Sequence, residues 1–165
     1  MKLNLIVAIS KNKCIGKNNK LPWFNKDDLK HFAKTTINNK NNAVVMGSKT
    51  FKSLDYKPLK YRKNFVLTKK PFIYNTNEQL KFLNDPQKVI DYSKYKKYDE
   101  LWIIGGNEIY NHFINNYKLD KVVITIINEH CYNCDTYATF LSNLNLNIYN
   151  VKNIKNGTIL YCDII

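Results

Sequence analysis

The sequence has little glycine, a single arginine and no long apolar run. Five of its 165 residues are glycine, whereas average usage would give about twelve. We therefore expect these five to lie where the backbone needs positive φ or must approach a ligand closely. Arg62 is the one arginine among 26 basic residues. Because a planar guanidinium can grip a carboxylate or phosphate through two hydrogen bonds, Arg62 is a candidate for that role, although chance placement explains a lone arginine equally well.

The shortness of the apolar runs excludes a membrane-spanning segment. Residues 1–10 hold an apolar stretch that is too short for a secretory signal, and no later run reaches the length of a membrane span. The sequence therefore predicts a cytoplasmic protein without a membrane anchor. Its length suits one domain, residues 1–165, with a core that needs no disulfide or metal.

The four cysteines are expected to be free thiols, because disulfides are rare in a reducing compartment. Cys131 and Cys134 have the spacing of a pair of metal ligands and follow His130. A structural zinc site normally needs two such pairs. We therefore predict no metal.

The positive charge is concentrated in one half of the chain. The net charge is +13; residues 1–80 carry 17 basic and 4 acidic side chains, and residues 81–165 carry nine of each. Such asymmetry suggests an anionic partner: a nucleic acid, a membrane surface or a phosphorylated small molecule. Compositional drift towards Lys, Asn, Ile and Tyr, as in an AT-rich genome, explains the total better than the asymmetry.

Apolar runs alternate with helical patterns along the chain. Short runs rich in β-branched residues predict buried strands at residues 5–9, 43–46, 64–67, 101–104 and 121–127. Helices are predicted at 27–37, 49–54, 78–83 and 107–114, and residues 92–98 are interpreted as a solvated surface segment. Alternation of this kind indicates an α/β fold with a central, mostly parallel mixed sheet flanked by helices. Residues 147–165 predict a C-terminal β-hairpin around Asn156 and Gly157.

Glycines mark two of the predicted strand-to-helix junctions. Gly47 follows one strand and Gly105 and Gly106 follow another, each just before a helix. Ligands of parallel sheets bind at the carboxyl ends of strands, and helix N-termini favour phosphate. Either motif alone could be a plain tight turn. Two of them in a basic chain favour a dinucleotide whose pyrophosphate lies across both.

Asp28 is the candidate for a buried carboxylate. Pro22 keeps Leu21 out of helical geometry, so the helix is expected to begin near Asp27. At helical spacing Asp28 shares a face with Phe32, whereas Asp27 shares a polar face and is expected to be solvated or capping. A buried carboxylate is costly unless it binds donors. It binds either a ligand or, as at many helix starts, local backbone N–H groups.

These segments together resemble the dihydrofolate reductase family. The similarity covers Leu5 to Ser10, Ile15-Gly16, Leu21-Pro22-Trp23 and Asp28-Leu29-x-x-Phe32, which match its first strand, mobile loop and first helix. It continues through Val44 to Phe51, Pro58-Leu59-x-x-Arg62-x-Asn64, Ile104-Gly105-Gly106-x-x-Ile109-Tyr110, Thr125 and Asp135-Thr136. Each block alone is modest support, but their common order and spacing are a strong signal.

The resemblance implies a role for each matching residue. Asp28 would bind the 2-amino group and N3 of the pterin, Thr125 would hydrogen-bond Asp28, and Trp23 would complete the catalytic set. The substrate pocket would comprise Ile6, Ala8, Asp28, Leu29, Phe32, Leu54, Arg62, Ile104 and Thr125, with Arg62 on the α-carboxylate of the glutamate tail. The NADPH site would comprise Ala8, Ile15, Gly16, Gly47, Ser48, Lys49, Thr50, Thr68, Lys69, Gly105, Gly106, Asn107, Glu108, Ile109 and Tyr110. The Gly105–Gly106 peptide is expected to be cis.

The implied reaction is reduction of 7,8-dihydrofolate to tetrahydrofolate, which supports one-carbon metabolism and thymidylate synthesis. Hydride would pass to C6 and a proton, delivered by water, to N5, while residues 15–24 close over the nicotinamide. The implied partners are dihydrofolate, NADPH and antifolate inhibitors. A monomer without specific nucleic-acid or membrane binding is expected.

Two positions depart from the family pattern. Ser48 stands where a basic residue often binds the 2′-phosphate of NADPH, and Lys49, Lys69 and Lys70 are candidates to replace that charge. Cys134 stands where glycine is common, which puts the coupling of the late loop to the mobile loop in doubt.

Two alternative functions compete with this one. A related reductase that acts on a pyrimidine intermediate of riboflavin synthesis would share the fold, but Asp28, Phe32 and Arg62 match a pterin with a glutamate tail. A basic nucleic-acid-binding domain would explain the charge but not the glycines, the buried carboxylate or the single arginine. Steep salt dependence of binding would reveal it.

Overall fold

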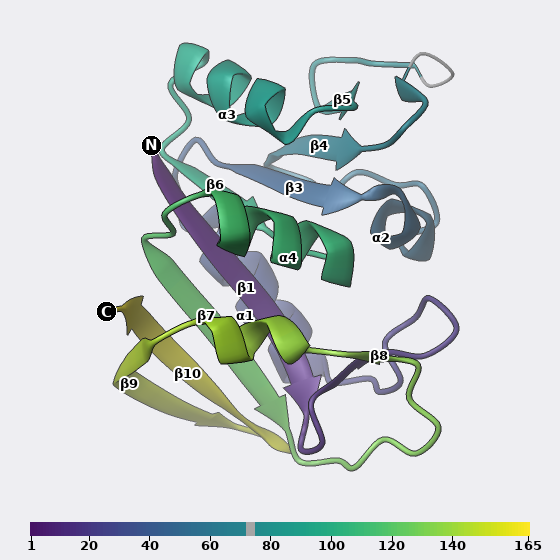
Figure 1. Cartoon of the computed structure of the whole chain (residues 1–165), viewed down its shortest axis with the longest axis vertical. Helices are drawn as coiled ribbons and strands as arrows, with labels where there is room; N and C mark the ends of the chain where they lie inside the picture. The colour runs from purple at the N-terminus through teal and green to yellow at the C-terminus, as the bar shows by residue number, and fades with distance from the viewer. Residues whose placement is uncertain (72–74) are drawn as a thin grey trace.

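The protein is built around one large sheet (Figure 1). The structure is a computed structural model that describes residues 1–71 and 75–165. The sheet has eight strands in the order β5-β4-β3-β6-β1-β7-β10-β9, and β2 and β8 form a separate pair. The strands are β1 (Lys2–Ser10), β2 (Cys14–Gly16), β3 (Ala43–Gly47), β4 (Lys63–Leu67), β5 (Leu80–Leu83), β6 (Glu100–Ile103), β7 (Lys121–Ile127), β8 (Thr136–Tyr137), β9 (Leu146–Ile154) and β10 (Gly157–Ile164). The helices are α1 (Lys26–Ile37), α2 (Ser48–Ser53), α3 (Pro86–Tyr95), α4 (Asn107–Asn116) and the short 3-10 helix η2 (Thr139–Asn143).

Strand direction in the large sheet is mixed. Strands β5, β4, β3, β6, β1 and β7 pair in parallel, whereas β10 is antiparallel to both β7 and β9. The carboxyl ends of the parallel strands therefore meet along one edge of the molecule, where α2 and the chain that follows β1 also lie (Figure 1). This arrangement confirms the predicted α/β fold, the five predicted strands and the C-terminal hairpin.

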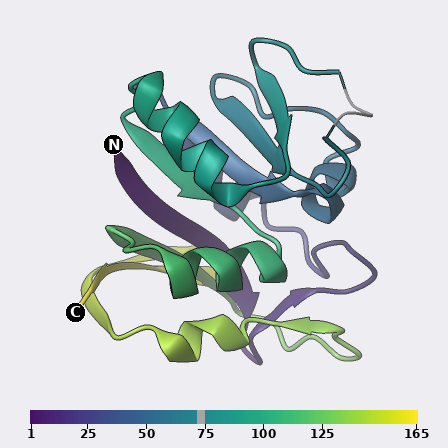
Figure 2. The same cartoon turned by 45° about the horizontal axis from the view of Figure 1, so that its top comes forward.

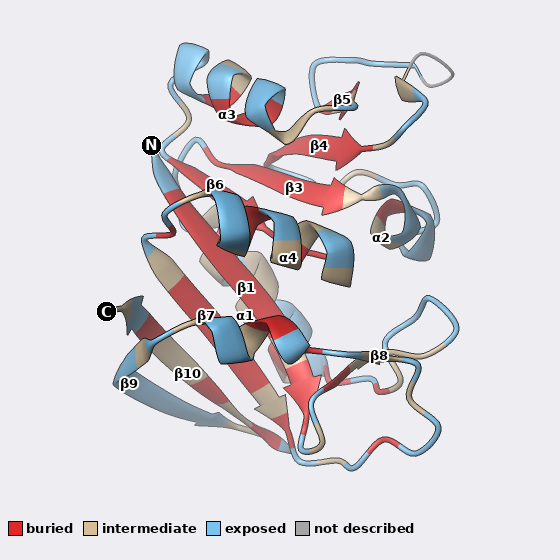
Figure 3. Cartoon of the chain, viewed as in Figure 1, coloured by how far each residue is buried: buried red, intermediate tan, exposed pale blue. Residues whose placement is uncertain are grey.

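Helices cover both faces of the sheet. Helix α1 lies on one face, and α3, α4 and η2 lie on the other (Figures 1 and 2). The face beneath α3 and α4 packs around Phe65, Phe113 and Phe140. The face beneath α1 packs around Phe51 and Trp102. The central strands are consequently buried on both sides, whereas β9 at the sheet edge is exposed along most of its length (Figure 3).

The helix predicted at residues 78–83 is wrong. Leu80–Leu83 forms the edge strand β5, which pairs in parallel with β4 and buries alternate residues, Leu80 and Phe82. A helix follows instead at Pro86–Tyr95. Residues 94–97 are exposed, as the interpretation of residues 92–98 as a solvated surface segment predicted, whereas Ser93 is buried. Asp85 caps that helix and Pro86 occupies its first turn, a start signal that the pattern of apolar residues concealed.

The prediction of four free thiols is wrong for two of them. Cys14 and Cys134 form a disulfide, whereas Cys131 and Cys162 are free and buried. Pairing of β2 with β8 brings the two bonded residues to a Cα–Cα distance of 5.9 Å, although 120 positions separate them in the sequence. Proximity of this kind depends on the tertiary fold, so cysteine spacing did not reveal it.

Within the part of the chain that the structure describes, no helix is long and apolar enough to cross a membrane. The same residues contain no group of three or more His, Cys, Asp or Glu side chains placed to hold a metal ion.

Candidate active site

The first turn of α1 holds Asp28 inside the protein. Helix α1 begins at Lys26 and is capped by Asn25, whose side chain accepts a hydrogen bond from the Asp28 N–H at 3.0 Å. Asp27 is half-buried and accepts from the Lys155 backbone, so Asn25 rather than Asp27 is the cap. The Asp28 side chain is 7 % exposed. The Asn25 side-chain oxygen is a local acceptor that satisfies a free N–H of the helix start, and the Asp28 carboxylate is left facing the interior.

Two opposing effects set the acidity of Asp28. Burial raises the pKa of its carboxyl, and a hydrogen bond from the Thr125 side chain lowers it. Thr125 lies on β7, is 1 % exposed, and pairs in register with Ala8 of β1. Residues paired across neighbouring strands project to the same face. The sheet thus presents Thr125 and Ala8 together beneath the start of α1.

Apolar residues predicted for the substrate pocket gather on the same face. Ile6, Phe32, Leu54 and Ile104 belong to one hydrophobic cluster, in which Ile6 is buried and the other three are partly exposed. Leu29 does not join this cluster and is 46 % exposed. The structure therefore brings four of the predicted wall residues together and places Leu29 at the surface, one position beyond Asp28.

A hydrogen bond joins the two glycine turns. The N–H of Gly47, at the end of β3, donates to the carbonyl of Gly105 at 2.8 Å. The Gly105–Gly106 peptide is cis, as predicted, and Gly105 has φ +108. A Cβ at Gly105 would lie 3.1 Å from the Tyr110 ring, and a Cβ at Gly47 would lie 3.1 Å from Ile109. Positive φ and close approach therefore both favour glycine at position 105, and close approach to the Ile109 side chain favours it at position 47.

Two helices begin directly at these turns. Gly47 is the N-cap of α2 and Gly106 is the N-cap of α4, and neither position has a side-chain cap. Free N–H groups and the helix dipole make such starts suitable for an anion. Thr50 lies against Gly106, because a Cβ built at Gly106 would be 3.5 Å from the Thr50 hydroxyl. The other predicted residues around these starts are Ser48, Lys49, Asn107 and Glu108, which are exposed or half-buried.

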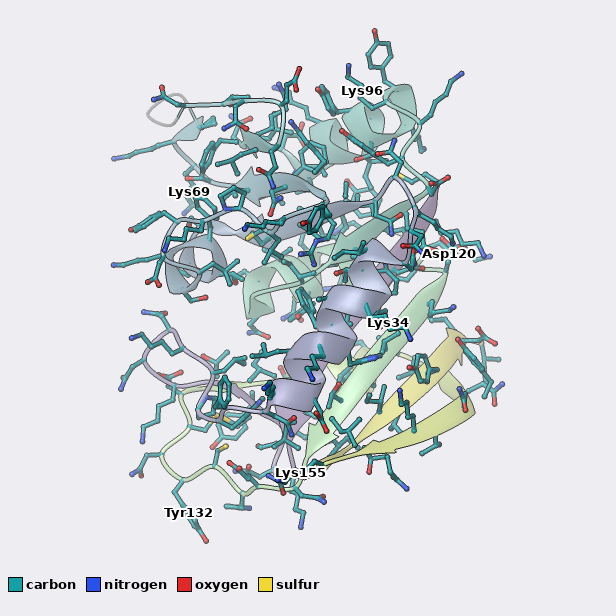
Figure 4. The ribbon with its side chains drawn as sticks, turned by 180° about the vertical axis from the view of Figure 1, so that it is seen from behind. Lys34, Lys69, Lys96, Asp120, Tyr132 and Lys155 are labelled. Carbon is teal, nitrogen blue, oxygen red and sulfur yellow. A yellow bond between two sulfur atoms is a disulfide. The ribbon has the colours of Figure 1, made fainter. Side chains whose placement is uncertain are left out.

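The end of β4 lies near the first of these turns. Thr68 directly follows β4, is half-buried, and its N–H donates to the Leu83 carbonyl at 2.9 Å. Lys69 is exposed, and Figure 4 shows it on the same side of the molecule as α2. Strands β3 and β4 are neighbours and parallel, so their carboxyl ends bring Lys69 and Lys70 to the edge that α2 occupies.

Tyr110 connects α4 to the middle of the sheet. Its hydroxyl donates to the Ile6 carbonyl at 2.8 Å. Burial, followed by the charge of Asp28, raises the pKa of this phenol far above its ordinary range. The hydroxyl therefore stays protonated and keeps donating. Through this bond α4, the second glycine turn and β1 hold one another in place.

Arg62 is buried at the far end of the α1 face. Its Nη1 donates to the Thr36 hydroxyl at 2.7 Å and its Nε donates to the Lys60 carbonyl at 2.9 Å. The guanidinium lies 5.9 Å from the centre of the Phe32 ring. None of the described residues accepts a hydrogen bond from Nη2. The arginine is thus held rigidly beside the apolar cluster that contains Phe32.

Residues 15–24 run from β2 towards the start of α1. Ile15 and Gly16 belong to β2, which pairs with β8, and both are half-buried. Trp23 is buried in a small cluster with Cys14, Ile127 and Cys131, against which Ala8 packs. The Trp23 indole Nε1 is buried and has no partner among the described residues. An unpaired donor therefore lies beside the strand that carries Ala8.

The sequence interpretation missed three supporting residues. Thr36 fixes Arg62, and Asn64 exchanges hydrogen bonds with both backbone groups of Leu59, which shapes the loop before Arg62. Cys14 carries the disulfide beside Ile15. The available signal for Asn64 was its place in the segment Pro58 to Asn64 that resembles the family; no sequence signal indicated Thr36 or Cys14.

Comparisons with known proteins agree with one another. Residues 2–158 match a family model described as dihydrofolate reductase. The chain is similar to the dihydrofolate reductase of Ureaplasma parvum serovar 3, with 38 % identity over 137 residues, 82 % of this chain and 80 % of the relative. It is also similar to the viral dihydrofolate reductase of Saimiriine herpesvirus 2, with 37 % identity over 144 residues, 82 % of this chain and 67 % of the relative.

A solved structure has the same fold. Dihydrofolate reductase from Enterococcus faecalis, complexed with NADP(H) and RAB-propyl, superposes with a TM-score of 0.80 and 26 % sequence identity. The superposition covers 99 % of this chain and 96 % of that one.

Proposed function

The chain belongs to the dihydrofolate reductase family, and from that premise we propose that Asp28 and Thr125 form the centre at which it reduces dihydrofolate with NADPH. The activity follows from the family match, from relatives that are dihydrofolate reductases and from a structural neighbour that binds NADP(H). The observation that carries the site assignment is the burial of Asp28 in contact with Thr125. A carboxylate in that position lowers the overall stability unless a ligand uses it.

The residues at the two glycine turns fit a dinucleotide. The N-caps of α2 and α4 lack side-chain partners, and side chains at Gly47 or Gly105 would enter the space that their neighbours fill. We assign the phosphates to residues 47–50 and 105–108, and the nicotinamide to Ala8, Ile15, Gly16 and Tyr110, with Ile109 behind Gly47. When bound, NADPH supplies the hydride.

Asp28 orients the pterin. Its two carboxylate oxygens match the 2-amino group and N3 of the ring, and a hydrogen bond to a charged acceptor is stronger than one between neutral groups. The Thr125 hydroxyl holds the carboxylate in position and favours its ionised form. The negative charge in turn favours a protonated pterin. Ile6, Phe32, Leu54, Ile104 and the surface residue Leu29 would enclose the rings.

Delivery of a proton to N5 requires a donor other than Asp28, which binds the far side of the pterin. We assign that delivery to a water molecule. Trp23 is suited to hold a water, because its buried Nε1 donor has no partner among the described residues. Closure of residues 15–24 over the nicotinamide would exclude the bulk solvent.

Arg62 would bind the α-carboxylate of the glutamate tail. Its Nε and Nη1 groups are fixed by Lys60 and Thr36, so the guanidinium is pre-organised for an anion. For the 2′-phosphate of NADPH, Lys49, Lys69 and Lys70 would replace the charge that Ser48 lacks. A lysine serves a phosphate as a point charge.

The protein binds a small-molecule substrate and inhibitors of its family. We further propose that it acts as a cytoplasmic monomer, as a single domain over residues 1–165. The pyrimidine-reductase and nucleic-acid-binding alternatives receive no support from the family match or from the relatives.

The decisive experiment follows absorbance at 340 nm with purified protein, NADPH and dihydrofolate, and repeats it with NADH. We expect oxidation of NADPH that depends on dihydrofolate and is lost in Asp28→Asn at neutral pH, with NADPH binding largely retained. Asp27→Asn removes a charge from the same helix turn and should retain activity. Near-normal turnover by Asp28→Asn would refute the assignment of the site, and an NADPH/NADH ratio near one would refute the role of the lysines.

A further inference from the structure

The Cys14–Cys134 disulfide joins the two loops beside the expected nicotinamide site. Cys14 is fully buried at the start of β2, and Cys134 is half-buried just before β8. The Gly16 carbonyl oxygen lies 3.5 Å from the sulfur of Cys14 and 3.3 Å from that of Cys134. The bond therefore lies directly against the backbone of Gly16. It lies at the small β2–β8 sheet and is attached to no strand of the large sheet.

Without the disulfide, the outer part of residues 15–24 is weakly attached. The Asn18 N–H donates to Asp135 at 2.7 Å in an exposed position, and the Asp135 N–H donates to Gly16 at 3.3 Å. Residues 18–21 are exposed. Exposed hydrogen bonds with few buried apolar contacts open at low free-energy cost. The covalent bond adds to the β2–β8 pairing a tie between these loops that solution conditions can form or break.

We propose that Cys14 and Cys134 form a reversible redox link that slows the opening of residues 15–24 and the exchange of cofactor. Ile15 and Gly16 directly follow Cys14, so oxidation fixes the backbone that faces the nicotinamide. Reduction leaves the weaker hydrogen bonds and lets the segment open more often. The inference rests on the proposed function for its effect on cofactor exchange, but not for the change in loop motion.

Thiol–disulfide exchange supplies a balanced chemical step. The thiolate of Cys134, the half-exposed cysteine, attacks a low-molecular-weight disulfide and releases one thiol, which forms a mixed disulfide. The Cys14 thiolate then attacks the Cys134 sulfur and releases the second thiol. Two protein thiols are oxidised, one small disulfide is reduced to two thiols, and the two protons pass to those thiols. Reduction runs through the same mixed disulfide in reverse.

The first part of the test establishes the link chemically. The full chain is equilibrated with oxidised glutathione or with dithiothreitol, free thiols are alkylated after unfolding in denaturant, and peptides are identified by mass spectrometry. We expect a cross-linked Cys14–Cys134 peptide in the oxidised sample and four alkylated cysteines in the reduced one. Failure to form the cross-link, or failure of dithiothreitol to remove it, overturns the proposal.

The second part measures motion and cofactor release separately. Amide hydrogen exchange of residues 15–24 needs no ligand and should be slower in the oxidised protein. Release of NADPH, followed by stopped-flow fluorescence against excess NADP⁺, should be roughly three- to tenfold slower after oxidation, because opening of the segment gates release. Cys134→Ser should remove both differences, and Cys162→Ala, which alters a cysteine on β10, should retain them.

The outcomes separate the two proposals. Equal exchange of residues 15–24 in the two redox states overturns the redox link. Slower exchange with no binding of NADPH in either state supports the link and contradicts the proposed function instead. Slower exchange with equal release rates overturns the gating of the cofactor.

Discussion

The N–H of Gly47 donates to the carbonyl of Gly105 at 2.8 Å, so two turns that lie 58 residues apart in the chain form one structural unit. Both turns end parallel strands of the large sheet and begin a helix. Side chains from α4 then pack against both glycines, Ile109 on Gly47 and Tyr110 on Gly105. The position of each expected phosphate-binding helix start therefore depends on the other.

Gly105→Ala is expected to destabilise the protein. A residue with a Cβ is disfavoured at φ +108, and the new methyl would lie 3.1 Å from the Tyr110 ring. The strained backbone and the overpacking together should cost about 2–4 kcal/mol, measured by urea unfolding without ligand. Gly106→Ala is the matched control, since its Cβ would meet Thr50 at an ordinary 3.5 Å. Equal losses in the two variants would contradict the argument.

Asp28→Asn is expected to be more stable than the parent protein at neutral pH. Burial raises the pKa of Asp28 above its usual value of 3.8 in the unfolded chain. Below that value the carboxyl is protonated in both the folded and the unfolded chain, so Asp28 does not oppose folding. As the pH rises through the folded pKa, the folded protein must bury a charge and its stability falls. Asparagine carries no charge at any pH, so it avoids this loss.

Melting curves of the ligand-free proteins between pH 3.5 and 8 test this prediction. The gain in melting temperature of Asp28→Asn over the parent protein should grow with pH and vanish at the acidic end. Each kcal/mol of added stability should raise the melting temperature by about 2–4 °C. Asp27→Asn corrects for the loss of one negative charge from a strongly basic protein. A gain that does not depend on pH would show that desolvation of Asp28 is not its cause.

Arg62→Lys is expected to raise the KM for dihydrofolate while kcat changes little. Lysine keeps the charge but loses the planar fork, and hydrogen bonds to charged groups contribute about 1.5–3 kcal/mol. The expected increase in KM is therefore roughly ten- to hundredfold. A pterin that lacks the glutamate tail should be reduced equally well by both proteins. An equal loss with that shortened substrate would mean that Arg62 acts through its structural bond to Thr36.

Lys60 is an exposed neighbour of Arg62, and Lys60→Gln is the control variant. It should leave the KM values for both substrates unchanged.

Much of the architecture could be predicted from local sequence, because buried parallel strands leave continuous apolar runs. The five such runs are strands in the structure, and the C-terminal hairpin turns at residues 155–156, directly before Gly157. The edge strand Leu80–Leu83 escaped because it is short and half-exposed. Helix Pro86–Tyr95 escaped because its polar face is dense with lysine and tyrosine. Pairing with β4 outweighed local preference in the strand, whereas the helix follows its own local start signal at Asp85 and Pro86.

The sequence by itself determined the residue types of the site: a carboxylate among apolar neighbours at Asp28, a lone Arg62, and rare glycines at two strand ends. Only the tertiary structure decided which of them meet, because contacts between Asp28 and Thr125, Gly47 and Gly105, or Arg62 and Thr36 join segments far apart in the chain. The Cys14–Cys134 bond is the clearest case. Composition predicted free thiols, and the pairing of β2 with β8 placed two sulfur atoms within bonding distance, since proximity is a property of the folded chain and not of its local pattern.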